Sequence, residues 1–187
     1  GQVHEKVVHI WLPTLLIATQ SQGTSKPRPL AREDSMMKLI TATVTMHVRP
    51  EITMALGGHQ HGIGRDGGAT RMIRKVSASM TINPGDAFTS LDTANAYGTA
   101  SRLNIVRIAQ QQTPEFAPFA SLIWSSGEHT PRGISLTIDD GPQYGCPIVA
   151  TDGLTQGNAA SNIGYCLAQL AAIEDAVPIL RIKVSVV

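Results

Sequence analysis

The chain has 187 residues and a mass of 19.9 kDa, which is long enough for one domain with a buried core. Hydrophobic residues make up 42% and charged residues 16%, so the composition excludes an intrinsically disordered protein. Residues 1–75 hold ten Lys and Arg against five Asp and Glu, the remainder holds five against nine, and the net charge is +1. A basic half beside an acidic half fits contact with a polyanion, but it also fits an ordinary solvated surface.

The two cysteines, Cys146 and Cys166, have neither the spacing of zinc ligands nor that of a disulfide framework. A reducing compartment is therefore the expectation. The first apolar run, Val7 to Ala18, is interrupted by a histidine and a proline and is too short to cross a bilayer. We expect a protein that is not secreted and has no membrane partner.

The amino-terminal part predicts two helices after an apolar entry segment. Residues 7–18 indicate a strand or a short helix, and residues 20–29, rich in Ser, Gly, Thr and Pro, indicate a loop. Asp34 predicts the N-cap of a helix that bends or stops at Pro50. Asp66 predicts the cap of a second helix, whose inward-facing residues are expected to be Met72, Ile73, Val76 and Met80.

The carboxyl-terminal part predicts alternating strands and helices. After a turn at 83–86, a strand is expected to end at Asp92. The remaining expectations are a helix over 99–112, a helix starting at Thr113-Pro114, a strand over 133–139 paired with 145–150, a helix over 157–176 and a final strand over 180–187. Gly164 lies inside an expected helix, where glycine is unfavourable by roughly 1 kcal/mol, so we expect close packing there.

Residues 89–102 contain the main candidate functional side chains of the chain. Asp92 is expected at the tip of a buried strand, where α/β-type enzymes place a metal ligand or a catalytic acid. An aromatic residue, Tyr97, follows five residues later. An aspartate that simply caps the following turn is the alternative interpretation.

Four segments together resemble the reverse transcriptases of non-LTR retroelements. The pattern Asp-x-x-Asn-Ala-Tyr at 92–97 is similar to their motif A, and Gln156-Gly157 within 152–161 is similar to motif B. Residues 26–31, Lys-Pro-Arg-Pro-Leu-Ala, resemble the fingers segment with its Arg-Pro signature. Residues 60–69 resemble the Gln-x-Gly and Gly-Ala segment that precedes motif A. The four occur in the family's order and cover most of the chain.

The resemblance implies a set of site residues for two-metal nucleotidyl transfer. Asp92 matches the motif A carboxylate that bridges two Mg²⁺ ions, and the carbonyl of Thr93 is expected to help hold the metal. Tyr97 matches the aromatic that excludes a ribose 2′-hydroxyl. The implied nucleotide-binding residues are Lys26, Arg28, Thr93, Tyr97, Gln156 and Gly157. The implied partners are an RNA template, a DNA primer and deoxynucleotides, and the implied location is the nucleus or the cytoplasm.

The chain departs from the family in its second carboxylates. Nothing after Asp152 resembles motif C, an aromatic-x-Asp-Asp turn, and Asp139-Asp140 precedes motif B, which is the wrong position for it. The thumb is also missing. One carboxylate cannot hold two metal ions against their hydration, so the chain by itself is expected not to polymerise.

The resemblance implies an α+β fold, with helices packed on one face of a small, mainly antiparallel palm sheet. Residues 1–85 are expected to be a fingers-like region and residues 86–187 a partial palm containing motifs A and B. The leading hypothesis is a fragment or remnant of an RNA-directed DNA polymerase. A non-catalytic nucleic-acid-binding or scaffolding protein derived from such an enzyme is the second. A small-molecule α/β enzyme that uses Asp92 with Cys146 or a histidine is the third.

Overall fold

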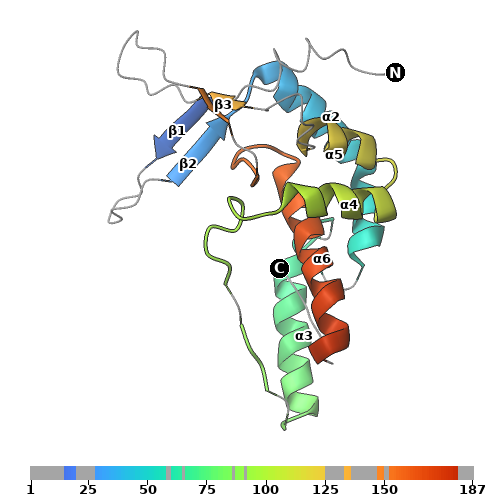
Figure 1. Cartoon of the computed structure of the whole chain (residues 1–187). Helices are drawn as coiled ribbons and strands as arrows, with labels where there is room; N and C mark the ends of the chain where they lie inside the picture. The colour runs from blue at the N-terminus through green and yellow to red at the C-terminus, as the bar shows by residue number, and fades with distance from the viewer. Residues whose placement is uncertain are drawn as a thin grey trace.

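The computed structural model describes residues 15–19, 28–57, 60–64, 66–85, 87–90, 92–124, 133–135, 147–149 and 152–180 (Figure 1). This part of the chain is mainly helical and contains five helices and four short strands. In chain order the elements are β1 (Leu15–Thr19), β2 (Arg28–Arg32), α2 (Ser35–Leu56), α3 (Gly68–Ile82), α4 (Arg102–Gln112), α5 (Ala117–Trp124), β3 (Gly133–Ser135), β4 (Pro147–Val149) and α6 (Ser161–Leu180).

The strands form a small mixed sheet in the order β2-β1-β3-β4, to one side of the helices (Figure 1). β1 pairs antiparallel with β2 and parallel with β3. The antiparallel pairing of β3 with β4 confirms the expected pairing of 133–139 with 145–150, within the residues that are described.

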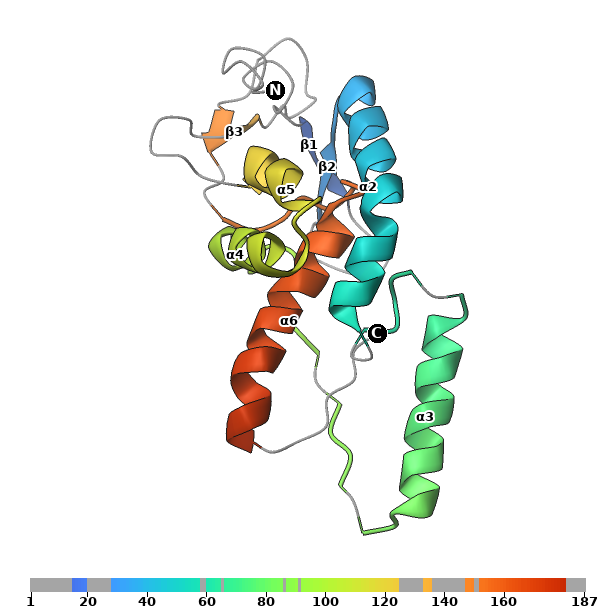
Figure 2. The same cartoon turned by 90° about the vertical axis from the view of Figure 1, so that its right-hand side faces the viewer.

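The buried core lies among helices. α6 runs through the centre, α4 lies across it, and α5 and α2 complete the packing (Figures 1 and 2). Aromatic rings fill the space between α4, α5 and α6, with Phe116 and Trp124 in an edge-on arrangement and their centroids 5.9 Å apart. The largest fully buried apolar side chains are Phe116, Ile52, Ile105, Ile108, Leu167 and Val48.

The predicted N-cap of α2 is confirmed, and its predicted end is not. Asp34 is the N-cap of α2, and its carboxylate accepts a hydrogen bond from the backbone N–H of Met36 at 2.8 Å. The helix was expected to bend or stop at Pro50. It does not stop there, because α2 continues to Leu56. The turn after the proline is retained by tertiary packing, since Ile52 and Leu56 are both buried in the core.

The helix expected to start at Thr113-Pro114 begins a few residues later. Thr113 is the C-cap of α4, and its carbonyl accepts hydrogen bonds from the N–H groups of Phe116 and Ala117 before α5 begins. The apolar side chains in and next to this helix pack inward: Phe116 and Ile123 are buried, and Phe119 packs against the core.

α3 contradicts two expectations. Its N-cap is Gly67, in the left-handed region at φ 65°, and the side chain of Asp66 does not cap it. The apolar residues of α3 were expected to face inward, but Ile73 and Met80 are exposed, and the helix stands apart from α2 and α6 (Figure 2). Helical periodicity alone cannot establish that a neighbouring element exists to cover the apolar face.

The predicted α+β fold, with helices packed on one face of a mainly antiparallel palm sheet, is wrong: the described part of the chain is mainly helical, and its core lies among the helices and not on the sheet. Residues 87–90 and 92–93, expected as the strand that ends at Asp92, are irregular and exposed. A strand needs a hydrogen-bonded neighbour, and the described residues provide none at this position. Leu180, expected in the final strand, is the last residue of α6, and residues 181–187 lie outside the described part.

Close packing at Gly164 is confirmed. A Cβ atom at this position would lie 2.7 Å from Cη2 of Trp124 and 3.3 Å from Cδ1 of Leu154. α6 therefore needs glycine here to let the Trp124 ring reach its backbone. The division of the chain at residue 85 into fingers and palm remains a prediction.

Candidate ligand-binding pocket

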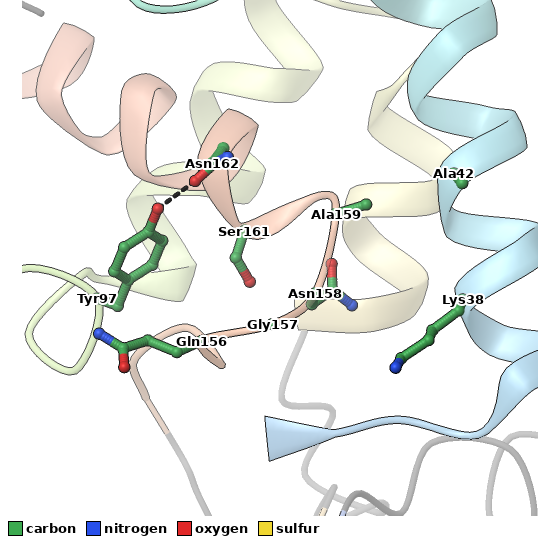
Figure 3. Close-up of a pocket in the computed structure, with 9 residues that line it drawn as sticks. All are labelled: Lys38, Ala42, Tyr97, Gln156, Gly157, Asn158, Ala159, Ser161 and Asn162. Carbon is green, nitrogen blue, oxygen red and sulfur yellow. Dashed lines mark hydrogen bonds between the residues drawn. The ribbon is translucent and has the colours of Figure 1, made fainter. Parts of the chain in front are cut away.

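A cavity of about 600 Å³ opens between the amino-terminal half of α2, the loop before α4 and the amino-terminal end of α6 (Figure 3). Its volume is in the range of small-molecule sites, about 300–1,000 Å³. Most of the side chains around it are polar. The residues that line it are Lys38, Ala42, Tyr97, Gln156, Gly157, Asn158, Ala159, Ser161 and Asn162.

Backbone hydrogen bonds join the two loops that form one wall of the pocket. The N–H of Leu154 donates to the carbonyl of Tyr97 at 2.7 Å, and the N–H of Gly153 donates to the carbonyl of Ala100 at 3.1 Å. Gly153 has φ 79°, and a Cβ atom there would lie 2.7 Å from the carbonyl oxygen of Gly98. Glycine at 153 therefore allows the loop bearing Gln156 to lie against the loop bearing Tyr97.

Side chains strengthen the same junction at the start of α4. The carboxylate of Asp152 accepts hydrogen bonds from the N–H of Arg102 at 2.8 Å and of Gly153 at 3.0 Å. The Nε–H of Arg102 donates to the carbonyl of Gly153 at 2.6 Å. Arg102 is buried, and burial lowers the pKa of its guanidinium while the charge of Asp152 opposes that shift.

Tyr97 is oriented by α6. Its hydroxyl donates a hydrogen bond to Oδ1 of Asn162 (Figure 3), and its ring centroid lies 5.5 Å from that of Tyr165. Burial raises the pKa of the Tyr97 hydroxyl, and Cys166 and Tyr165 add to this shift. The hydroxyl is therefore a hydrogen-bond donor at neutral pH, and the ring forms one side wall of the pocket.

The first turn of α6 forms the back of the pocket. Asn158 precedes the helix, and its side-chain oxygen accepts a hydrogen bond from the N–H of Ala160 at 2.7 Å. Its side-chain nitrogen donates to Oε1 of Glu33, just before α2. Oγ of Ser161, in a residue that is only 2% exposed, has no hydrogen-bond partner among the described residues.

The structure brings together three of the residues that motif resemblance selected. Tyr97, Gln156 and Gly157 line one cavity although the first is about sixty residues from the other two. Asp92 and Thr93 do not line it and are exposed on the irregular segment before Tyr97. The backbone of Arg28 lies in β2, but its side chain is not described. Lys26 lies outside the described residues.

The residues around Asp92 do not fit the expected Mg²⁺ centre. Within the described ranges, no group of three or more His, Cys, Asp or Glu side chains could hold a metal ion. A divalent cation bound by protein needs several oxygen ligands, and exposed Asp92 with the carbonyl of Thr93 is too small a set. We therefore assign no metal-dependent step to this chain.

Lys38, Asn158, Ser161 and Asn162 belong to the pocket but were not selected from the sequence. The sequence held a signal for one of them, because asparagine before Ala-Ala-Ser is a typical N-cap. An N-cap at Asn158 would have moved the predicted helix start from Gly157 toward Ser161. Nothing in the sequence indicated Lys38, which comes from α2, more than a hundred residues earlier than α6.

Comparison with models of known protein families, with curated proteins and with solved structures gave no significant match. Among the helices that the structure describes, none combines the length and the apolar character needed to cross a membrane.

Proposed function

We propose that this chain is a fragment or remnant of an RNA-directed DNA polymerase and that its pocket binds a nucleotide. Its role is binding rather than nucleotidyl transfer. The proposal rests on the motif resemblance together with one geometric observation: Tyr97 and Gln156, selected from separate motifs, line the same cavity.

The pocket has the size and chemistry that a nucleotide requires. Its volume of about 600 Å³ can accept a nucleoside with its first phosphate. Tyr97 offers an aromatic wall beside a sugar, and the amide of Gln156 can both donate and accept hydrogen bonds with a base or a sugar hydroxyl. Gly157, at φ 109°, leaves the backbone open to close approach.

Catalysis by this chain is not part of the proposal. Polymerisation depends on positioning and on neutralisation of phosphate charge by two cations. Asp92 is exposed and does not line the pocket, so the proposal assigns its carboxylate no role in binding or catalysis. In a primer-extension assay we expect no product from this chain.

Isothermal titration calorimetry with dATP and ATP, in buffer containing EDTA, tests the proposal. We expect saturable binding with a Kd of about 0.1–1 mM, which corresponds to roughly −4 to −5.5 kcal/mol. Tyr97→Ala and Gln156→Ala should each weaken binding about five-fold or more. Gln110→Ala, an exposed glutamine on α4, is the matched control and should leave the Kd unchanged.

Two results would overturn the nucleotide-binding proposal. One is the absence of saturable heat for both nucleotides up to several millimolar. The other is binding that is equally strong in the Tyr97→Ala, Gln156→Ala and Gln110→Ala variants, since the ligand would then lie elsewhere.

A non-catalytic nucleic-acid-binding protein is the second candidate, and α3 favours it. The segment Gly68–Ile82 contains Arg71, Arg74 and Lys75, all exposed, and no acidic residue. If these residues contact phosphates, affinity for an RNA–DNA hybrid should fall steeply as salt concentration rises. Fluorescence anisotropy between 50 and 300 mM KCl would measure this, and a flat response would exclude the candidate.

A further inference from the structure

Among the described residues, two backbone N–H groups at the amino-terminal end of α6 have no hydrogen-bond partner. This helix spans Ser161–Leu180, and the N–H groups of Ala160 and Ser161 are bonded to Asn158. For the N–H groups of Asn162 and Ile163, no hydrogen-bond partner occurs among the described residues. Such a helix end carries a partial positive charge and attracts anions.

The side chain of Ser161 supplies a second, independent observation. Only 2% of the surface of Ser161 is exposed, and its Oγ has no hydrogen-bond partner among the described residues. Figure 3 shows this oxygen directed into the space between Tyr97 and Asn158. A buried hydroxyl without a partner is destabilising by about 1–3 kcal/mol, so a ligand acceptor at this point would relieve the penalty.

Lys38 completes the arrangement from the opposite wall. It is exposed on α2, and its side chain extends toward the pocket (Figure 3). A cation, a hydroxyl donor and a helix amino terminus around one cavity are the donors that a phosphate group requires.

A carboxylate next to Asn158 should oppose the binding of an anion in the pocket. The carboxylate of Glu33 is hydrogen-bonded through Oε1 to the side chain of Asn158, and its Oε2 is buried without a partner among the described residues. Because like charges repel, Glu33 should weaken phosphate binding, and its neutralisation should strengthen it.

We propose that a phosphate group binds at the amino-terminal end of α6, with Ser161 Oγ donating to it and Lys38 neutralising its charge. The inference rests on the proposed function only in assigning this phosphate to a nucleotide, whose nucleoside part then lies toward Tyr97 and Gln156. The free anion and the nucleotide share the same chemistry at this point.

Calorimetric titration of the full chain with inorganic phosphate, dAMP and deoxyadenosine tests the proposal and separates the two sources. Lys38→Gln should raise the Kd for phosphate and for dAMP about ten-fold, Ser161→Ala about three- to ten-fold, and Glu33→Gln should lower it a few-fold. Arg107→Gln, an exposed arginine on α4, is the control and should change neither. Thermal unfolding of each variant verifies that it is folded.

The possible outcomes are distinct. Phosphate binding that depends on Lys38 and Ser161, without any preference for dAMP over phosphate, supports the phosphate site and contradicts the nucleotide-binding function. Binding of dAMP that depends on Tyr97 but is unchanged in Lys38→Gln and Ser161→Ala overturns the phosphate site and leaves the function standing. The phosphate site is also overturned if phosphate binds equally well to Lys38→Gln, Ser161→Ala and Arg107→Gln, or if phosphate does not bind to the unmodified chain.

Discussion

Asp152 and Arg102 join the loop before Gln156 to the start of α4 through two hydrogen bonds, and a third, from the Gly153 N–H to the Asp152 carboxylate, orients that carboxylate within its own loop. The Asp152 carboxylate accepts from the Arg102 N–H at 2.8 Å and from the Gly153 N–H at 3.0 Å, while the Arg102 side chain donates to the Gly153 carbonyl at 2.6 Å. The loop after Tyr97 is thereby fixed against the loop before Gln156. This junction positions one wall of the pocket without contributing a side chain to it.

Arg102→Ala should lower the free energy of unfolding by about 2–3 kcal/mol, because the buried Gly153 carbonyl loses a charged donor and the arginine stem leaves a gap. Urea denaturation followed by circular dichroism measures the change. Arg107→Ala, an exposed arginine on the same helix, should stay within about 0.5 kcal/mol of the unmodified chain. Similar losses in both variants would mean that the junction contributes no specific stability.

Gly164→Ala should destabilise the chain by about 1–3 kcal/mol, despite the gain of roughly 1 kcal/mol in helix propensity. The added methyl group would lie 2.7 Å from the ring of Trp124, which is itself buried and cannot move freely. Gly85→Ala is the matched control, since a Cβ atom there meets nothing within 4 Å. A more stable Gly164→Ala variant, measured by the same urea denaturation, would contradict the packing around Trp124.

Glu51→Ala should lower the free energy of unfolding by about 1–2 kcal/mol. The two carboxylate oxygens of Glu51, on α2, accept hydrogen bonds from the N–H groups of Glu115 at 3.0 Å and Phe116 at 3.2 Å, just before α5. Hydrogen exchange of the Glu115 and Phe116 amides provides a local readout. These amides should exchange faster in Glu51→Ala than in Glu51→Gln. If they exchange equally fast in Glu51→Ala and in the unmodified chain, the Glu51 carboxylate does not protect them.

Cys166 should make stability fall with pH above pH 9. Burial raises the pKa of its thiol from the ordinary 9.0 to about 11, against a smaller opposing effect of the hydrogen bond from Gln60. Between these values the unfolded chain releases the proton while the folded chain retains it, so the free energy of unfolding decreases as pH rises. A shift of this size corresponds to about 2–3 kcal/mol at most.

Comparison of the unmodified chain with Cys166→Ala isolates this effect from other groups that titrate in the same range. The variant should be less stable at pH 7, and the difference between the two chains should shrink from pH 9 to pH 11. Urea denaturation at pH 7, 9, 10 and 11 measures it. A difference that stays constant across this range would show that the thiol titrates normally in the folded chain.

Local sequence signals determined much of the helical structure correctly. The N-cap predicted at Asp34 and the close packing predicted at Gly164 are both present in the structure. The cap depends on residues two positions apart, so capping rules suffice to predict it. A glycine inside an expected helix indicated close packing at 164, but its partner, Trp124 of α5, is seen only in the structure.

Motif resemblance selected part of the pocket, because Tyr97, Gln156 and Gly157 line one cavity. It did not identify Lys38 or Ser161, since the first comes from a distant helix and the second depends on where α6 begins. It also placed Asp92 at the centre of a site, whereas the structure leaves this residue exposed and outside the pocket.

The sequence by itself thus indicated which segments are helical, including the N-cap of α2, but it misplaced the end of α2, the start of α5 and both ends of α6. Only the tertiary structure decided that Asp92 does not end a strand, that the Ile73 face of α3 stays exposed, and that Lys38 meets the amino-terminal end of α6. The physical reason is that helix hydrogen bonds close within a few residues, whereas strand pairing, burial of a face and assembly of a pocket require partners that are distant in the chain.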